Sequence, residues 1–216
     1  LGLRLMEITR RQFELEDEAV KLLRESQALR AGTLNIAGGA PLHIVGIVAA
    51  FQKKYPGVRI TLSQGNSDEV MTQIHDYSAD IGELGQAPND DRLLNIPLRS
   101  DPIVAFVPKD HKWAKRKKIT LAELAAEPLV LREPGSTTRQ LVEEEFRRLG
   151  IEAEFVMEVE GREAAREVVA AGIGVGIVSK LEFGHDERLT PIALSDCKAV
   201  MQESIVCLKE RADLRI

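Results

Sequence analysis

Residues Leu129–Leu149, LVLREPGSTTRQLVEEEFRRL, carry the clearest structural pattern in the chain. The first three residues are apolar and predict a short buried strand, Pro134-Gly135 predicts a turn, and apolar positions then recur with helical spacing. A second strand–turn–helix unit of the same kind lies at Leu34–Tyr55. Two such units predict two α/β lobes with a cleft between them.

Strands and helices alternate along most of the remaining chain. We expect strands at 33–37, 58–63, 79–83, 129–131, 155–159, 175–178, 189–194 and 203–208, and helices at 68–77, 120–126, 136–149 and 162–171. Ser67 and Thr120 are the predicted N-caps of two of these helices. The long strand-like run from Asn95 to Val107 is suited to a segment that leaves one lobe and enters the other. This alternation predicts a largely parallel sheet covered on both faces.

The N-terminal segment predicts a long helix. Residues Leu3–Ala31 contain no Pro or Gly and are followed by Gly32, a common helix terminator. A single heptad seam runs through them, formed by Leu5, Ile8, Gln12, Leu15, Ala19, Leu22, Ser26 and Leu29. Such a helix is about 43 Å long, which exceeds the width of a small domain. We interpret it as a dimerising helix; the alternative is an amphipathic helix folded onto the chain's own core.

The composition is that of a globular protein. The chain has 216 residues, of which 44% are hydrophobic and 29% charged, enough for one large or two small domains. Its longest apolar stretch, Ile44–Phe51, is far shorter than the ~20 residues that cross a bilayer, and no export signal opens the sequence. We therefore expect a soluble chain with no membrane partner.

Charge and cysteine content argue against direct nucleic-acid binding, a disulfide framework and a structural zinc site. The net charge of −5 predicts that this stretch does not contact nucleic acid directly. Cys197 and Cys207 are too few for a disulfide framework or a four-ligand zinc site, and they fit reduced thiols in a cytoplasm. Because the sequence opens at Leu1-Gly2 without Met, we expect it to be a fragment of a longer protein.

Three turns place polar groups where ligands collect in α/β folds, at the carboxyl ends of strands. They are Gly39-Ala40-Pro41, Gly65-Asn66-Ser67 and Pro134-Gly135-Ser136-Thr137-Thr138. The third is the strongest candidate, because its glycine admits a ligand and its hydroxyls and helix N-terminus favour an anion. Arg139 and Arg162 could add a charged fork for a carboxylate or phosphate. The alternatives are that Ser136 only caps its helix and that both arginines lie on the surface.

The sequence motifs that mark common enzyme classes are incomplete or missing. GSTTRQ lacks the lysine of a phosphate-binding loop, and Gly172–Gly176 runs from helix into strand, the reverse of a dinucleotide fingerprint. No Gly-x-Ser-x-Gly elbow is present. The histidines have no metal-ligand spacing: His43, His75, His111 and His185. The basic loop 112–118 is interpreted as solvated rather than as a nucleic-acid patch. We therefore expect no catalytic residue, metal or cofactor.

Taken in order, the seam helix, Gly-Thr-Leu-Asn-Ile-Ala at 32–37 and Pro-Gly-Ser-Thr-Thr-Arg at 134–139 resemble a known family. Val169–Val178, VAAGIGVGIV, is similar to its late signature of helix, Ala-Ala-Gly-x-Gly and strand. The chain resembles the linker helix and effector-binding domain of LysR-type bacterial transcriptional regulators, without their N-terminal winged helix-turn-helix. Where many relatives have Ser or Thr in the first turn, this chain has Ala40 and Pro41, and Pro41 has no N–H to donate.

The resemblance implies a periplasmic-binding-protein-like fold. Two Rossmann-like lobes would be joined by two crossover strands: residues 1–32 form the linker helix, 33–100 with 201–216 the first lobe, and 101–200 the second. It implies ligand-binding positions at Gly39, Ala40, Pro41, Ser67, Ser100, Thr137, Thr138, Gly161 and Arg162, to which the charge argument above adds Arg139.

We predict a ligand-sensing module rather than an enzyme. A small anionic metabolite would bind between the lobes and set their angle, and a cytoplasmic homodimer or homotetramer would pass the change to DNA-binding domains absent from this chain. Two other classes stay open. One is a solute-binding protein of a transport system with the same architecture; the other is an enzyme on this scaffold, such as a deaminase or dehydratase.

Overall fold

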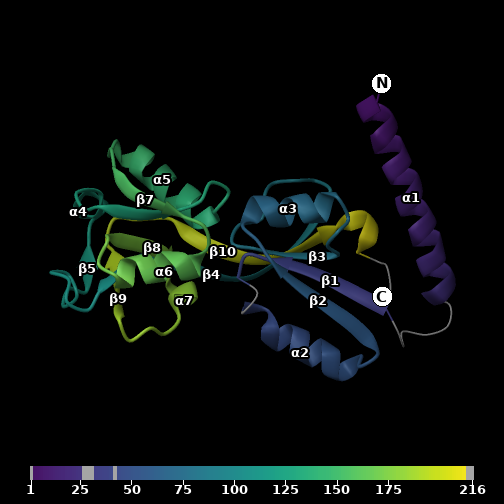
Figure 1. Cartoon of the computed structure of the whole chain (residues 1–216), viewed down its shortest axis with the longest axis horizontal. Helices are drawn as coiled ribbons and strands as arrows, with labels where there is room; N and C mark the ends of the chain where they lie inside the picture. The colour runs from purple at the N-terminus through teal and green to yellow at the C-terminus, as the bar shows by residue number, and fades with distance from the viewer. Residues whose placement is uncertain (1, 26–31, 41–42, 213–216) are drawn as a thin grey trace.

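The computed structural model describes residues 2–25, 32–40 and 43–212. The elements in chain order are α1 (Gly2–Glu25), β1 (Gly32–Gly38), α2 (Val45–Lys54), β2 (Val58–Gln64), α3 (Ser67–His75), β3 (Ile81–Leu84), β4 (Leu93–Pro108), β5 (Lys118–Ile119), α4 (Leu121–Ala125), β6 (Leu129–Arg132), α5 (Thr137–Leu149), β7 (Phe155–Val159), α6 (Arg162–Ala170), β8 (Val175–Ser179), α7 (Lys180–Phe183), β9 (Leu189–Leu194), β10 (Val200–Leu208) and the 3-10 turn η2 (Lys209–Arg211). Figure 1 shows two α/β lobes side by side, with the N-terminal helix at one end of the molecule, next to the lobe that contains β1, β2 and β3.

Two long strands join the lobes. The first lobe, lobe I, contains the parallel trio β2-β1-β3, and the second, lobe II, contains the parallel trio β8-β6-β7. Between them, β4 and β10 run antiparallel to each other from Leu93↔Leu208 to Val200↔Pro102. The predicted two lobes and two crossover strands are confirmed. The sheet is parallel within each trio, but each trio meets a crossover strand in antiparallel pairing, because the chain returns through β10.

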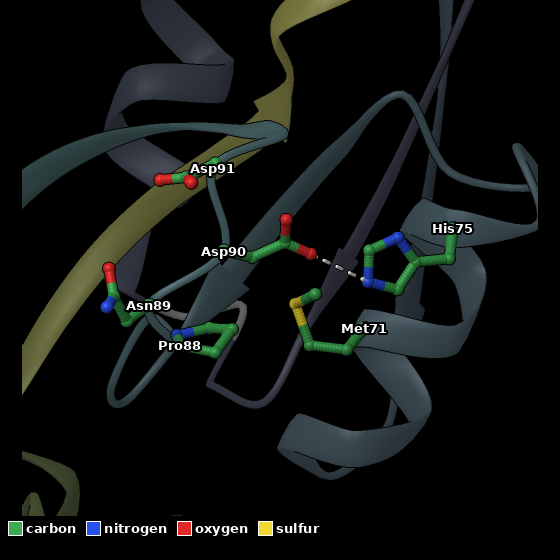
Figure 2. Close-up of a pocket in the computed structure, with 6 residues that line it drawn as sticks. All are labelled: Met71, His75, Pro88, Asn89, Asp90 and Asp91. Atoms are coloured by element: carbon green, nitrogen blue, oxygen red, sulfur yellow. Dashed lines mark ion pairs between the residues drawn. The ribbon is translucent and has the colours of Figure 1, made fainter.

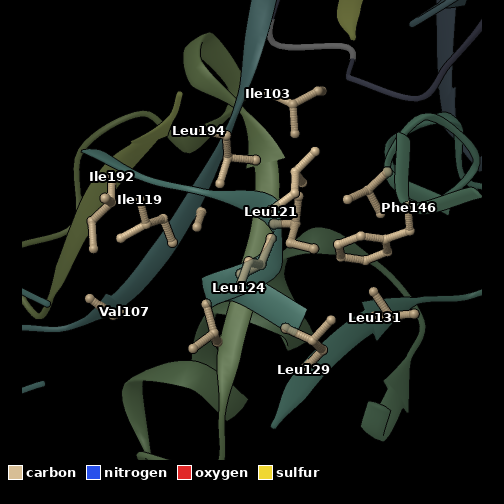
Figure 3. Packing of buried hydrophobic residues seen from close by; sticks show 14 of the residues in the cluster. Ile103, Val107, Ile119, Leu121, Leu124, Leu129, Leu131, Phe146, Ile192 and Leu194 are labelled. Atoms are coloured by element: carbon tan, nitrogen blue, oxygen red, sulfur yellow. The ribbon is translucent and has the colours of Figure 1, made fainter. Parts of the chain in front are cut away.

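Helices cover both faces of each lobe, as predicted. In lobe I, α3 packs on one side of the sheet through Val70 and Ile74, and Ile44, just before α2, packs on the other. In lobe II, the larger core lies under α4 and α5 and is shown in Figure 3. Its labelled members are Ile103, Val107, Ile119, Leu121, Leu124, Leu129, Leu131, Phe146, Ile192 and Leu194. A smaller core around Phe106 and Val169 lies under α6 and α7. Each lobe therefore has a hydrophobic core on both sides of its own strands. The division of the chain at residues 100/101 and 200/201 stays a prediction.

Helix caps follow the sequence with one correction. Thr120 caps α4 as predicted, in a capping box with Glu123. The cap of α3 is Asn66, however, and not Ser67. Asn66 accepts a hydrogen bond from the backbone N–H of Glu69 at 3.1 Å, and the Glu69 carboxylate accepts the N–H of Asn66 at 2.8 Å. This reciprocal pair satisfies the helix start and leaves the Ser67 hydroxyl free to contact the other lobe.

The predicted N-terminal helix is present as α1, from Gly2 to Glu25. Residues 26–31 of the predicted helix, with the seam positions Ser26 and Leu29, lie outside the described residues. The apolar side chains described along α1 are exposed: Leu5, Met6, Ile8, Phe13 and Leu15. Among its contacts with the lobes is an ion pair of Arg10 with Asp76, at 3.7 Å. None of the described helices is long and apolar enough to cross a membrane.

Candidate functional site

A narrow cavity lies where the two lobes meet. Its lining combines three turns that precede α2, α3 and α5 with side chains from β3, β6, α6, α7 and β10. The lining residues are Gly39, Ala40, Gly65, Asn66, Ser67, Glu83, Gly85, Arg132, Ser136, Thr137, Thr138, Arg162, Glu182 and Met201. The cavity measures about 20 Å³, the space of about one water molecule. The lobes are thus closed against each other.

Two hydroxyl groups bridge the lobes directly. Ser67, in the first turn of α3, lies 2.6 Å from Thr137, in the first turn of α5, measured between Oγ and Oγ1. Beside them, Gly135 has a φ of +87°, and a Cβ placed there would lie 2.9 Å from the Asn66 Oδ1 atom of lobe I. The turn before α5 therefore needs glycine both for its backbone conformation and for the close approach of the lobes.

The N-terminus of α5 presents several hydrogen-bonding groups to the cavity. Ser136, Thr137 and Thr138 are all buried, and the Ser136 side chain makes no capping hydrogen bond. The first backbone N–H groups of a helix have no partner within the helix and carry its positive dipole end. The alternative in which Ser136 only caps the helix is thereby wrong. Three hydroxyls and a helix N-terminus instead face the space between the lobes.

Arg162, the first residue of α6, crosses from lobe II to lobe I. Its Nη2 donates to the backbone oxygen of Gly39 at 2.6 Å and to Oε1 of Glu182 at 2.9 Å. Both side chains of the Arg162–Glu182 pair are at least 90% buried. One guanidinium therefore holds a loop of the opposite lobe and a buried carboxylate at the same time.

A second guanidinium lies at the end of β6. Arg132 binds the neighbouring Glu133 through two hydrogen bonds of 2.7 Å. Glu133 also accepts the backbone N–H of Gly161 at 3.1 Å, which positions the turn before α6. Burial raises the pKa of Glu133, but the hydrogen bonds from Arg132 and from backbone N–H groups, together with the charge of Arg132, outweigh burial, and the net pKa is lowered. Glu133 therefore stays ionised and holds Arg132 at the cavity.

Buried carboxylates oppose this positive charge. Burial raises the pKa of Glu83, although a backbone hydrogen bond from Ala40 at 2.7 Å lowers it in part. Burial also raises the pKa of Glu182, and the charge of Arg162 opposes that shift. A raised pKa means that each carboxyl group binds its proton more tightly than it does in water.

The fold brings most of the predicted ligand positions together. Those that line the cavity are Gly39, Ala40, Ser67, Thr137, Thr138 and Arg162. Gly161 lies next to it as the N-cap of α6. Pro41 lies outside the described residues. Ser100 is exposed on β4, opposite Gln202, and does not line the cavity.

Arg139 also lies away from the cavity. Its Nε binds Glu143 at 2.7 Å, and its Nη1 binds Glu158 at 2.6 Å and the backbone oxygen of Arg132 at 2.9 Å. Arg139 follows Thr138 on the helix, so it emerges on a different face and reaches toward β7 instead of the other lobe.

Sequence reasoning missed three charged members of the lining. They are Glu83, Arg132 and Glu182. Arg132 had a recognisable signal, because it directly follows the apolar strand residues Leu129–Leu131, at the end where ligands collect. Glu182 had none, since its approach to Arg162 depends on how α7 packs beside α6.

A larger hollow lies on lobe I away from the cleft. It measures about 620 Å³ and is lined by Met71, His75, Pro88, Asn89, Asp90 and Asp91, as Figure 2 shows. His75 and Asp90 approach to 3.5 Å, and Asp90 also binds Arg92. Two carboxylates line this hollow without an unpaired cation among the residues that form it, so it does not suit an anion.

Comparisons with known proteins agree with this architecture. The model of the LysR substrate binding domain matches residues 26–215. The HTH-type transcriptional activator CmpR of Synechocystis is 30% identical over 185 residues, which make up 83% of this chain and 60% of CmpR. The chain thus spans less than two thirds of that relative.

Solved structures show the same fold. The Synechocystis PCC6803 CcmR regulatory domain in complex with 2-PG superposes with a TM-score of 0.75 at 24% identity, covering 82% of this chain and 88% of that chain. The cofactor-binding domain of the Cbl transcriptional regulator gives a TM-score of 0.73 at 26% identity, covering 82% and 81%. Two lobes, two crossover strands and a family match over most of the sequence lead to one assignment: the chain belongs to the LysR family and is the effector-binding domain of a LysR-type regulator.

Proposed function

We propose that this chain binds a small anionic metabolite between its lobes. The observation that carries the proposal is the meeting of Ser67 and Thr137 across the cleft, 2.6 Å apart at the N-terminus of α5. Arg132 and Arg162 line the same space. Hydroxyls, free backbone N–H groups and guanidiniums are the donors that bind carboxylates and phosphates. The solved CcmR regulatory domain contains 2-PG, which illustrates that this fold accommodates small ligands.

The closed cleft implies a mechanism for sensing. A cavity of about 20 Å³ is far below the ~300 Å³ or more of typical ligand pockets. A metabolite therefore enters only when the lobes move apart. Once bound, it favours the angle between the lobes at which the protein's hydrogen-bond donors surround it. The coupling it produces equals its difference in affinity between the two angles. β4 and β10 are the two connections that would bend.

Calorimetry and thermal shift test the ligand class. Carboxylate, phosphate, sulfate and phosphonate metabolites would be screened against matched neutral compounds. A ligand at about 100 times its dissociation constant adds about 2.7 kcal/mol, which raises the midpoint of a protein this size by roughly 5–11 °C. Stabilisation by neutral compounds alone would contradict the anionic assignment.

Variants then locate the site. Thr137→Val and Thr138→Val remove hydroxyls from the cavity lining, and each is expected to weaken the anion's affinity roughly tenfold, in line with hydrogen bonds to a charged group. Thr190→Val, on β9 and outside the lining, is the matched control. Equal affinities in all three variants and the unaltered chain would remove α5 from the site.

We further infer that the chain assembles as a homodimer or homotetramer through α1. Its apolar seam is exposed in the single chain, with Leu5 and Ile8 both more than 60% accessible. Seams of this kind are buried in coiled-coil dimers. Ile8→Glu is expected to shift the sedimentation coefficient toward that of the monomer, whereas Arg11→Gln, outside the seam, is not. Unchanged assembly of Ile8→Glu would exclude this interface.

In the full-length regulator, the lobe movement would be transmitted to DNA-binding domains, and the protein would act in the cytoplasm, where its DNA lies. The relatives are transcriptional regulators, which favours regulation over catalysis. The same family match favours a regulator over a solute-binding protein of a transport system.

A further inference from the structure

Three potential metal ligands meet inside lobe I, beneath the cleft. His43 lies between β1 and α2, Glu83 on β3 and Glu203 on β10. One candidate ligand atom from each side chain lies within 4.8 Å of the other two. Glu83 is 1% exposed and Glu203 is fully buried. Because the three residues are separated by 40 and 120 positions in the sequence, their spacing gives no sign of this cluster.

Each carboxylate accepts a hydrogen bond on its Oε2 atom from a group outside the cluster. The backbone N–H of Ala40 donates to Oε2 of Glu83 at 2.7 Å, and Nε of Arg99 donates to Oε2 of Glu203 at 2.5 Å. Oε1 of Glu203 pairs closely with Nδ1 of His43. Burial raises the pKa of Glu203, but hydrogen bonds from His43 and Arg99 outweigh burial, and the net pKa is lowered. Within the described part of the chain, the buried Oε1 of Glu83 has no hydrogen-bond partner.

This arrangement is incomplete as a purely internal network. A buried oxygen without a donor costs about 1–3 kcal/mol, and more when it is charged. Two buried carboxylates side by side also repel each other unless positive charge lies between them. Donors that fix the second oxygen of each carboxylate are a recurring feature of metal sites, where they orient the ligands.

We propose that His43, Glu83 and Glu203 form a binding site for a first-row divalent cation. One imidazole nitrogen and two carboxylate oxygens suit Zn²⁺, Co²⁺, Fe²⁺ or Mn²⁺ better than Mg²⁺, which prefers oxygen ligands and keeps its waters. Because Arg99 and His43 already pair with Glu203, the ion would chiefly compensate the buried carboxylate of Glu83. Three protein ligands leave at least one coordination position open.

The site is next to the cleft and distinct from the hydroxyl and guanidinium groups proposed for the anion. Glu83 also lines the cavity, and it holds Ala40 in the first turn. An ion bound to Glu83 would therefore stiffen the turn in which the backbone oxygen of Gly39 accepts a hydrogen bond from Arg162. The metal proposal does not depend on the proposed effector, because ion binding is measured on the chain alone.

Titration of the metal-free chain tests the site. The protein is treated with a chelator, dialysed, and titrated with ZnCl₂ by calorimetry and with CoCl₂ by visible absorption. We expect one ion per chain and a rise in thermal midpoint with Zn²⁺ that MgCl₂ at the same concentration does not produce. Cobalt bands without a thiolate charge-transfer band would support nitrogen and oxygen ligands and exclude Cys197 and Cys207.

Variants assign the ligands. Glu83→Gln and His43→Asn keep side-chain size and are each expected to weaken Zn²⁺ at least tenfold. His75→Gln is the matched control, because His75 faces Asp90 in the outer hollow of Figure 2 and offers a competing zinc site. Circular dichroism establishes that each variant is folded.

Three results would overturn the proposal. They are failure of the unaltered chain to bind Zn²⁺ or Co²⁺, loss of binding in His75→Gln with retention in Glu83→Gln, and a thiolate band in the cobalt spectrum. The first and third use the unaltered chain, so the site remains testable even if a variant does not fold.

Discussion

The contact between Arg162 and Glu182 makes a quantitative prediction about how the lobes are held together. Arg162→Met keeps the length and apolar stem of the side chain but removes the guanidinium. Glu182 then loses the partner that lies 2.9 Å away, and the backbone oxygen of Gly39 loses a donor at 2.6 Å. Both charged side chains are at most 10% exposed, so solvent does not replace the lost contacts.

The expected loss of unfolding free energy in Arg162→Met follows from the burial of both side chains. Removing one partner of a buried ion pair typically costs about 3–5 kcal/mol, because the remaining charge is left unpaired. At ~2–4 °C per kcal/mol for a chain of this size, the thermal midpoint should fall by roughly 6–20 °C at neutral pH. The fall should shrink in acid, because protonation removes the unpaired charge of Glu182.

Two companion variants separate this mechanism from simple loss of packing. Arg162→Met/Glu182→Met removes both charges and should recover more than half of the lost stability, since apolar replacements of buried pairs are often neutral. Arg188→Met breaks an exposed pair with Glu167 and should change the midpoint far less. Calorimetric melting at two pH values measures all of them. A small loss in Arg162→Met, or a double variant no more stable than the single one, would refute the reasoning.

Three further predictions concern backbone strain and ionisation. Gly135→Ala and Gly150→Ala both force alanine into positive φ, at +87° and +66°, and each should lose about 1–2 kcal/mol. Only in Gly135→Ala does the new Cβ meet lobe I, so only this variant should also push the lobes apart and enlarge the radius of gyration measured by X-ray scattering. Equal radii of gyration in the two variants would contradict the contact between Gly135 and Asn66. Because burial raises the pKa of Glu182 above 4.5, the folded state binds its proton more tightly, so this group's contribution to stability declines as pH rises above 4.5 through the raised pKa. Glu182→Gln should flatten that decline in melts across the pH range, and an unchanged slope would argue against it. The hydrogen bond to Glu210 raises the pKa of Tyr77 to about 12. In Glu210→Gln, the pKa of Tyr77 measured by ultraviolet titration should return toward 10, and the same pKa in both proteins would contradict the hydrogen bond.

Local sequence patterns were sufficient for most elements of this fold, although the two-residue strand β5 and the one-turn helix α7 were not predicted. Apolar runs and turn residues predicted both strand–turn–helix units, and the long run ending at Val107 predicted a crossover strand, observed as β4. Thr120 was predicted as a helix cap for the same reason, since its partner Glu123 is three residues away. Interactions between near neighbours can be read from spacing, because the geometry of a helix or strand fixes which residues meet.

The cleft was predicted in part. Thr137 and Thr138 were identified because a glycine turn and a helix start lie beside them in the sequence, and Ser67 because it closes a similar turn. The sequence could not show that Asn66 caps α3 and frees Ser67 for Thr137, because that choice depends on the lobe opposite. It also placed Arg139 with the ligand groups, whereas the structure engages it with Glu143 and Glu158.

The buried charges were decided by tertiary structure alone. Arg162 meets Glu182 because α6 and α7 lie side by side, and it meets Gly39 only when the lobes close. Glu83 meets Glu203 because β3 and β10 are neighbours in the sheet although they lie far apart in the chain. The sequence by itself determined the elements and their order, since these depend on short-range periodicity. The pairing of distant strands and lobes determined which charges share a dehydrated space, because such contacts form only after the chain has folded.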